Sequence, residues 1–323
     1  MPNNPTLPRP PFDPELEAVL ALVGEQLPTL TPETIQRLRE TPTPVELTDD
    51  VLADAGLVCR ETTIQGYEGA EIPVSVIARA DHTGTGPGIY HVHGGGMIAG
   101  QRLIGVTQLM SWIVEHDAVL VTAEYRLAPE FPDPYPVEDC YAGLVWTAEH
   151  AAELGIDPDR ILIAGASAGG GLSAGTALLA RDRKGPRLLG QVLICPMLDD
   201  RDETVSTLQY ETDGTWVRGG NRVGWGALLG ERRGTADVSV YAAPARASDL
   251  SGLPPAYIDC GSAEVFRDED VAYAAALWRA GVAAELHVWA GGFHGFDMLA
   301  PHTALARAAT AARNDWVARL LAP

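Results

Sequence analysis

A chain of 323 residues is long enough for one large α/β domain or two small ones, and 46 % hydrophobic residues permit a substantial core. The 43 acidic and 23 basic residues give a formal net charge of −20, which argues against nucleic acid and polyanionic substrates as partners. We interpret the acidic excess as a solvated surface that keeps the protein soluble.

From about residue 57, short β-rich runs alternate with helical stretches. The eight expected strands are 57–65, 72–80, 88–93, 118–125, 160–166, 188–195, 256–260 and 284–289. Helices are expected over 137–154, over 170–181 and from about residue 301 to the C-terminus. This alternation predicts an α/β fold with a mostly parallel eight-stranded sheet and helices on both faces. The first two strands would form an antiparallel hairpin at one edge.

Two segments interrupt this alternation without adding strands. Residues 1–50 are proline-rich and contain a helix-like stretch over 14–26, and residues 199–247 are polar and rich in glycine. We expect them to form one cap over the carboxyl ends of the strands, where open α/β sheets bind ligands. Residues 51–198 and 248–323 would then form the catalytic domain. The alternative is that the N-terminal segment is a loosely ordered tail.

Three consecutive glycines, Gly94 to Gly96, follow His93 directly after the third expected strand. Glycines in such a loop leave successive backbone N–H groups free of side chains. A loop of this kind, together with the N–H group after the nucleophile, builds the oxyanion hole of α/β-hydrolases. The pattern therefore predicts Gly94, Gly95 and Ala168 as oxyanion donors. The alternative is a flexible glycine turn.

Ser167 stands between a strand-like run and a helix-like run of small residues, within Gly-Ala-Ser-Ala-Gly. A strand that feeds a serine flanked by glycines, followed by a helix, is typical of a nucleophile elbow. At so sharp a bend, side chains at Gly165 and Gly169 would collide with the neighbouring strand or helix. We predict Ser167 as the nucleophile. The alternative is a helix start rich in small residues.

Acyl transfer by a serine also needs a base, which follows the acid in the chain order of this fold. His294 lies in a loop after a strand with glycines on both sides, so its imidazole can be aimed back at the elbow. His287 lies inside a strand, and His302 stands at a helix start where we expect exposure to solvent. The sequence therefore favours His294 as the base.

The triad acid is expected in the turn after the strand 256–260. Glu264 is placed for this role, and Asp268 and Asp259 are its rivals. Asp268 is expected to cap the helix that begins near Glu269, since aspartate is a favoured N-cap. Asp259 precedes the turn and would lie inside the sheet. We predict Glu264, with Asp268 as the main alternative.

Four blocks of the sequence match one family. They are His93–Gly96, Tyr125–Pro132 with the sequence YRLAPEFP, Gly165–Gly170 and Phe293–Phe296. Together they identify the chain as similar to the hormone-sensitive-lipase-like branch of the α/β-hydrolases, the bacterial family IV carboxylesterases. The resemblance covers residues 88 to 296 and implies the α/β-hydrolase fold with a helical cap.

The resemblance also implies hydrolysis of small-molecule esters, usually with short acyl chains, without a metal or organic cofactor. By resemblance, Arg126 and Glu130 are packing and ion-pair residues, and His93 braces the oxyanion loop. A homodimer paired through the strand 284–289 is implied only by the resemblance. The chain departs from the family at Ala166, where aspartate is common, and at Glu264, where an aspartate followed by proline is usual.

The predicted reaction is attack of Ser167 on an ester carbonyl, with an acyl-enzyme intermediate that water releases. An amidase, thioesterase or peptidase with the same triad remains open, because the difference lies in the shape of the leaving-group pocket. A third hypothesis is a non-catalytic small-molecule receptor of the same fold. Four side chains could line the pocket or pack the core: Met97, Tyr210, Trp216 and Trp225.

The beginning of the sequence has no basic region followed by an apolar stretch, and no apolar run approaches the length of a membrane span. The four cysteines, Cys59, Cys140, Cys195 and Cys260, form no CxxC or CxxxC pair. We therefore expect a cytoplasmic protein that does not bind membranes. Its cysteines are expected to be reduced, not part of a disulfide framework or a metal site.

Overall fold

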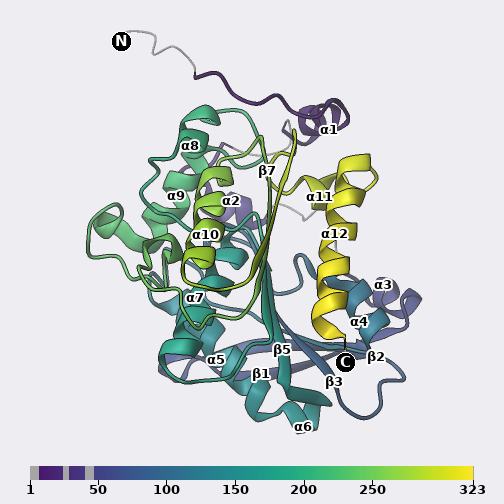
Figure 1. Ribbon diagram of the computed structural model, residues 1–323. Helices are drawn as coiled ribbons and strands as arrows, with labels where there is room; N and C mark the ends of the chain where they lie inside the picture. Colours follow the sequence, from purple (N-terminus) through teal and green to yellow (C-terminus); the bar gives the residue numbers. More distant parts are fainter. Residues whose placement is uncertain (1–6, 25–28, 41–46, 323) are drawn as a thin grey trace.

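The computed structural model describes residues 7–24, 29–40 and 47–322, and its centre is one eight-stranded sheet (Figure 1). The strands run in the order β1-β2-β4-β3-β5-β6-β7-β8. The β1–β2 and β2–β4 pairs are antiparallel, and the other pairs are parallel. The bounds are β1 Leu57–Gln65, β2 Glu71–Arg79, β3 Gly86–Val92, β4 Val119–Ala123, β5 Ile156–Ala166, β6 Gly190–Ile194, β7 Ala256–Gly261 and β8 Ala284–Trp289. The mostly parallel sheet that the sequence predicts is confirmed.

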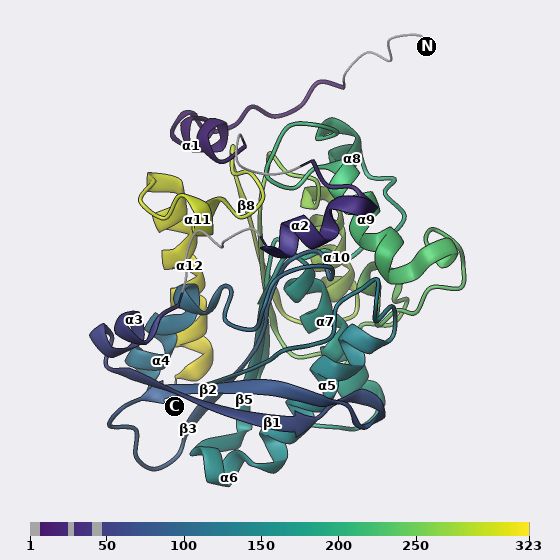
Figure 2. The ribbon, with the colours of Figure 1, turned by 180° about the vertical axis from the view of Figure 1, so that it is seen from behind.

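Helices cover both faces of the sheet (Figures 1 and 2). The helices α5, α7 and α10 pack on one face, and α3, α4 and α12 pack on the other. Their bounds are α3 Asp49–Asp54, α4 Met110–His116, α5 Tyr135–Glu149, α7 Ala168–Asp182, α10 Arg267–Arg279 and α12 Ala304–Leu321. The single helix expected over 137–154 is two helices, α5 and α6 (Ala151–Leu154), because His150 between them has non-helical dihedral angles.

The core lies on both sides of the sheet, which explains the continuous apolar runs of the central strands. All seven residues of β3 are buried. Ile89 packs with the α4 and α12 side, whereas Tyr90 and Val92 pack with the α5 and α7 side. A strand covered on both faces has no solvent side, so its sequence shows no alternation of polar and apolar residues.

The remaining helices lie beyond the carboxyl ends of the parallel strands (Figures 1 and 2). They are α1 Pro14–Gly24, α2 Ile35–Glu40, α8 Val205–Gln209 and α9 Arg218–Leu229, and the short α11 Phe296–Leu299 lies beside them. The helix expected over 14–26 appears as α1, and the last two residues of the expected range lie outside the described part of the chain. No helix among the described residues is both long and apolar enough to cross a membrane.

Hydrogen bonds hold the described N-terminal residues onto this end of the molecule. Gln209 Nε2 donates to the carbonyl of Pro8 at 2.6 Å, and the Tyr210 hydroxyl donates to the carbonyl of Pro10 at 2.9 Å. Arg39 donates to the Glu130 carboxylate at 2.7 and 2.9 Å. The two segments that interrupt the strand–helix alternation therefore contact each other above the sheet.

Candidate active site

Ser167 occupies the sharp turn between β5 and α7. Its backbone has φ 59° and ψ −125°, a strained combination for a residue with a side chain. A Cβ atom at Gly165 would lie 2.3 Å from the Gly169 carbonyl oxygen, and one at Gly169 would lie 2.1 Å from the Val92 carbonyl oxygen. Only glycine fits either position, so the local sequence forces the serine hydroxyl out of the backbone as in a nucleophile elbow.

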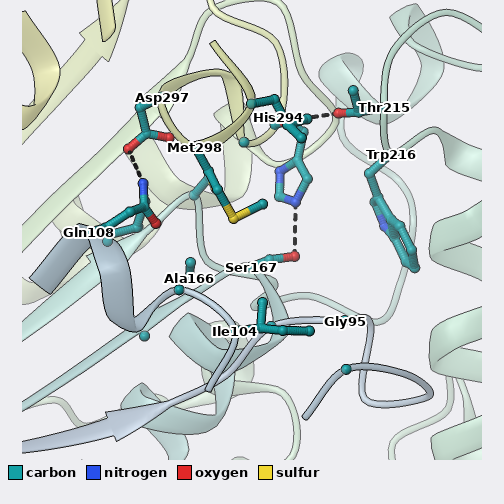
Figure 3. Close-up of a pocket in the computed structure, with 18 of the residues that line it drawn as sticks. Gly95, Ile104, Gln108, Ala166, Ser167, Thr215, Trp216, His294, Asp297 and Met298 are labelled. Carbon is teal, nitrogen blue, oxygen red and sulfur yellow. Dashed lines mark hydrogen bonds between the residues drawn. The ribbon is translucent and has the colours of Figure 1, made fainter. Parts of the chain in front are cut away.

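Two hydrogen bonds lead from Ser167 through His294 to Glu264, and Figure 3 shows the one between Ser167 and His294. His294 Nε2 lies 2.9 Å from Ser167 Oγ, and His294 Nδ1 lies 2.6 Å from Glu264 Oε2. Because a carboxylate accepts, Nδ1 carries the proton, and Nε2 is left to accept from the serine hydroxyl. The other Glu264 oxygen accepts from the Gly261 amide at 2.6 Å, which fixes the carboxylate.

The rival acids point elsewhere. Asp259 lies inside β7, as expected, and accepts from Arg313 at 3.0 Å. Asp268 accepts from the backbone N–H of Ser206 at 2.7 Å, near the start of α8. The expectation that Asp268 caps its own helix is wrong, because α10 begins one residue earlier, at Arg267.

The rival histidines are also placed away from the elbow. The ring of His287, in β8, stacks on two neighbouring rings. Its centroid lies 5.3 Å from the ring centroid of Trp289 and 5.4 Å from that of Tyr257. His302 is exposed to solvent in the turn before α12. The structure thus brings together the three residues that the sequence favours and separates the alternatives from them.

The glycine loop after β3 lies against the elbow. A Cβ atom at Gly94 would lie 2.9 Å from the Ala166 carbonyl oxygen and 3.5 Å from Ser167 Cβ. Within the described chain, the N–H groups of Gly94 and Gly95 have no hydrogen-bond partner. Ala168 is the first residue of α7, where N–H groups have no partner inside the helix. These are the properties that oxyanion donors require.

His93 holds this loop in place. Its Nδ1 donates to the Gly94 carbonyl at 2.8 Å, and its ring stacks on Tyr125 with centroids 4.1 Å apart. The Tyr125 hydroxyl donates in turn to the His93 carbonyl at 3.0 Å. Burial lowers the pKa of His93, so the ring is neutral and acts as a brace without a charge.

The block after β4 also makes the ion pairs that the resemblance implies. Arg126 binds the fully buried Asp139 carboxylate with two nitrogens at 2.7 and 2.8 Å. Glu130 receives two hydrogen bonds from Arg39 of α2. Neither Arg126 nor Glu130 lines the cavity at Ser167, so both have structural contacts and none with the reacting groups.

A cavity of about 290 Å³ opens onto Ser167 and His294. Val23 of α1, Leu38 of α2 and Trp216 are among the side chains that line it. Of the four side chains for which the sequence left pocket or packing open, Trp216 lines the cavity. The other three pack in the core with 0–1 % exposure: Met97, Tyr210 and Trp225.

Three potential metal ligands, from Cys195, Glu264 and His294, lie within 4.8 Å of one another. Glu264 and His294 already share a hydrogen bond of 2.6 Å. Burial is the main cause that raises the pKa of the Cys195 thiol well above its usual value, so the sulfur stays protonated. A protonated thiol beside a paired carboxylate and imidazole is a poor metal site.

Sequence reasoning missed several polar residues around the cavity. Thr215 donates its hydroxyl to the backbone carbonyl of His294, which fixes the loop that carries the imidazole. Gln108 and Asp297 line the cavity and bond to each other at 3.0 Å, 189 residues apart in the sequence (Figure 3). No local pattern marks these residues, because their proximity depends on how distant loops meet.

Comparison with known proteins shows the family of the chain. The family model described as alpha/beta hydrolase fold matches residues 89–298. Carboxylesterase NlhH of Mycobacterium tuberculosis is 35% identical over 293 residues, which cover 88% of each chain. The arylesterase of Saccharolobus solfataricus is 34% identical over 217 residues, 67% of this chain and 69% of its own.

Solved structures of esterases are similar to this chain over nearly its whole length. A bacterial heroin esterase superposes with a TM-score of 0.87 at 36% identity and covers 97% of this chain and 98% of its own. The elbow, the glycine loop and the mostly parallel sheet thus occur together in a chain similar to known esterases throughout its length. The chain therefore belongs to the α/β-hydrolase family, in its hormone-sensitive-lipase-like branch of carboxylic ester hydrolases.

Proposed function

We propose that the chain is a serine carboxylesterase that hydrolyses short-chain acyl esters through Ser167, His294 and Glu264. The observation that carries the proposal is the continuous hydrogen-bond chain of 2.9 and 2.6 Å through the imidazole. Its side chains are nearly enclosed, with exposures of 10 % at His294 and 1 % at Glu264. In such surroundings the carboxylate interacts strongly with an imidazolium.

The mechanism follows from these contacts. His294 Nε2 takes the hydroxyl proton as Ser167 Oγ attacks the ester carbonyl, and the amides of Gly94, Gly95 and Ala168 bind the oxyanion. The imidazolium then protonates the leaving alcohol. A water molecule, deprotonated by the same nitrogen, hydrolyses the acyl-enzyme, while Glu264 stays ionised and stabilises the imidazolium.

The preference for short acyl chains is supported by the size of the cavity. A volume of about 290 Å³ lies at the lower end of the range of small-molecule pockets, and it must hold both sides of the ester. We assign residues 1–50 and 199–247, as far as they are described, to a cap over the catalytic domain of residues 51–198 and 248–323. The cap contributes Val23, Leu38 and Trp216 to the lining of the cavity.

Hydrolysis of p-nitrophenyl acetate and butyrate by the wild type and by Ser167→Ala tests the proposal. The wild type is expected to release p-nitrophenol with saturation kinetics, and the variant is expected to lose activity by at least roughly 10³-fold. Circular dichroism should show the same fold for both proteins, because Ser→Ala removes only one oxygen atom. Retained activity in Ser167→Ala, or no activity in the wild type, would overturn the proposal.

We also assign the chain to the cytoplasm. The described cysteines, Cys59, Cys140, Cys195 and Cys260, are all free thiols, which suits a reducing compartment. Three of them are buried, and only Cys59 is partly exposed. Fractionation of the cells that make the protein would test this assignment, and activity in a secreted or membrane fraction would contradict it.

A further inference from the structure

One arm of the cavity is lined by hydrogen-bond acceptors that the proposed mechanism does not use. We call the stretch formed by His91, Gly105, Gln108 and Asp297 the acceptor arm. Gln108 and Asp297 lie on the side of Ser167 opposite Trp216 (Figure 3). The four residues come from β3, from the 3₁₀ turn Val106–Leu109 and the glycine before it, and from α11. The arm is therefore built where three separate segments of the chain meet.

The tautomer of His91 follows from its neighbours. The Thr122 hydroxyl donates to the Arg102 carbonyl at 2.8 Å, so its oxygen accepts from His91 Nδ1 at 3.0 Å. The proton of the neutral ring is thus on Nδ1, and Nε2 carries a lone pair. Burial is the main cause that lowers the pKa of His91 to about 3, so the ring is uncharged at neutral pH.

His91 Nε2 faces the arm without a partner. Gly105 lies beside it, since a Cβ atom at this glycine would lie 3.4 Å from Nε2, and both residues line the cavity. His91 itself is 3 % exposed, and no described residue donates to Nε2. An acceptor that opens into a cavity takes its donor from water, or from a ligand that displaces the water.

Gln108 presents a second acceptor, and its orientation is fixed. Asp297 accepts from Arg313 at 2.8 Å, in a pair with side-chain exposures of 4 % and 1 %. Because that carboxylate can only accept, the amide nitrogen of Gln108 must face it, at 3.0 Å. The amide oxygen, Oε1, is then directed away from Asp297 and has no partner among the described residues.

We propose that the acceptor arm binds a hydroxyl group of the substrate, so that the preferred substrates are esters with a hydroxyl on one side of the scissile bond. This inference rests on the proposed esterase function. A single hydroxyl proton suits His91 Nε2 or Gln108 Oε1, both of which are uncharged. Asp297 already accepts from Gln108 and from Arg313, which also contacts Asp259, so the acceptors left open in the arm are the two uncharged atoms. An apolar chain in the same arm would leave both acceptors unpaired, which is how such sites reject analogues that lack the polar group.

Matched ester pairs test this inference on both sides of the scissile bond. The acyl pair is p-nitrophenyl butyrate and p-nitrophenyl 3-hydroxybutyrate, and the alcohol pair is propyl butyrate and 3-hydroxypropyl butyrate. We expect kcat/KM to be about tenfold higher for the hydroxylated member of one pair, the gain from one neutral hydrogen bond in a partly enclosed site. The pair that shows the preference identifies which side of the ester enters the arm.

Two variants test whether the acceptor arm causes the preference for hydroxylated esters. Gln108→Met keeps the length of the side chain and removes Oε1, and His91→Phe keeps a ring and removes Nε2. Each is expected to lower the hydroxyl preference several-fold, without an equal loss of kcat/KM for the plain ester. Gln36→Met is the matched control, because this glutamine is exposed on α2 and should keep the full preference.

The possible failures are distinguishable. If neither pair of esters is hydrolysed, the proposed function fails. If the wild type hydrolyses the esters without preferring a hydroxylated member, or if the preference survives in both Gln108→Met and His91→Phe, the acceptor arm has no such role. Should His91→Phe fail to fold, Gln108→Met decides alone, since its side chain is only partly buried.

Discussion

At the scale of single residues, the sequence predicts the serine and the histidine of the proposed triad more firmly than its acid. Ser167 and His294 each lie between glycines after a strand, and this local pattern marks them without help from the fold. Glu264 and Asp268 follow the same strand within eight residues, and either could have turned toward the histidine. The loop path favours Glu264, whose carboxylate accepts from the Gly261 amide, whereas Asp268 lies in α10 and contacts Ser206.

Replacing Glu264 tests this choice. Glu264→Gln should lower kcat by roughly 10²–10⁴-fold, because an amide neither fixes the tautomer of His294 nor stabilises its imidazolium. Asp268→Asn is the matched control and should keep kcat within a few-fold, since it loses only contacts to the start of α8 and to Arg267. Esterase kinetics on the two variants measure this, and a larger loss of kcat in Asp268→Asn would make Asp268 the acid.

The burial of His91 leads us to predict how the free energy of unfolding depends on pH. Its pKa is about 3 in the folded state and 6.5 for an ordinary histidine, so the unfolded chain binds more protons between these values. The contribution of His91 to the free energy of unfolding is therefore present above about pH 6.5, and it is lost progressively as the pH falls toward 3. This loss is about 2 kcal/mol between pH 6.5 and pH 5.

Urea unfolding at pH 7 and pH 5 measures this effect in the wild type and in His91→Gln. Other groups that titrate, including the neighbouring His93, are common to both proteins. The change in the free energy of unfolding between pH 7 and pH 5 therefore differs between the two proteins only through His91. We expect the variant to lose less stability than the wild type on acidification. Equal losses in the two proteins would show that His91 is not buried as a neutral ring.

At the scale of elements, periodicity and glycine placement predicted all eight strands, with errors mainly at their ends. The strand expected over 160–166 begins four residues earlier, at Ile156, as β5. The break between α5 and α6 was not predicted, because His150 interrupts the helix without a proline or glycine to mark it. Such boundaries depend on tertiary packing, which overrides local propensity.

At the elbow, a glycine allows the helix α7 to lie close against the strand β3. Gly169→Ala would place a methyl group 2.1 Å from the Val92 carbonyl oxygen, so α7 would have to move away from β3. We expect a loss of several kcal/mol in the free energy of unfolding, or failure to fold.

Gly226→Ala is the matched control inside α9. A Cβ atom there meets nothing within 4 Å, so the substitution should stabilise the protein by about 0.5–1 kcal/mol through helix propensity. Thermal and urea unfolding of the two variants measure whether Gly169→Ala lowers the free energy of unfolding and Gly226→Ala raises it. A Gly169→Ala protein as stable as the wild type would contradict the close approach of α7 to β3.

At the scale of the whole molecule, the order of segments in the sequence predicts a cap, but not which of its side chains would line the cavity. Trp216 lines the cavity, whereas Trp225, nine residues further on, is fully buried in the core. The residues of the acceptor arm were also beyond prediction, since Gln108 and Asp297 meet only after the sheet has formed. Contacts between distant loops have no periodic signature.

The sheet edge at β8 leads to a prediction about assembly. Within the described chain β8 pairs only with β7, so its outer edge offers unpaired backbone groups, and Val288 on it is 41 % exposed. We propose that two chains pair through this edge. Light scattering after size exclusion is expected to give a dimer for the wild type and a monomer for Val288→Lys.

The control for this prediction is Val205→Lys. Val205 is 54 % exposed on α8, away from the sheet edge, so its replacement by lysine adds the same charge without touching β8. We expect this variant to remain a dimer. A monomeric wild type, or a Val288→Lys protein that stays dimeric, would exclude pairing through β8.

The most direct measurement of the central claim is the trapping of the acyl-enzyme. Rapid mixing with p-nitrophenyl acetate, followed by acid quench and peptide mass spectrometry, should find one acetyl group on the peptide that contains Ser167. A fast release of p-nitrophenol equal to the number of active sites should accompany it. An acetyl group on another residue, or turnover without any covalent intermediate, would contradict the account.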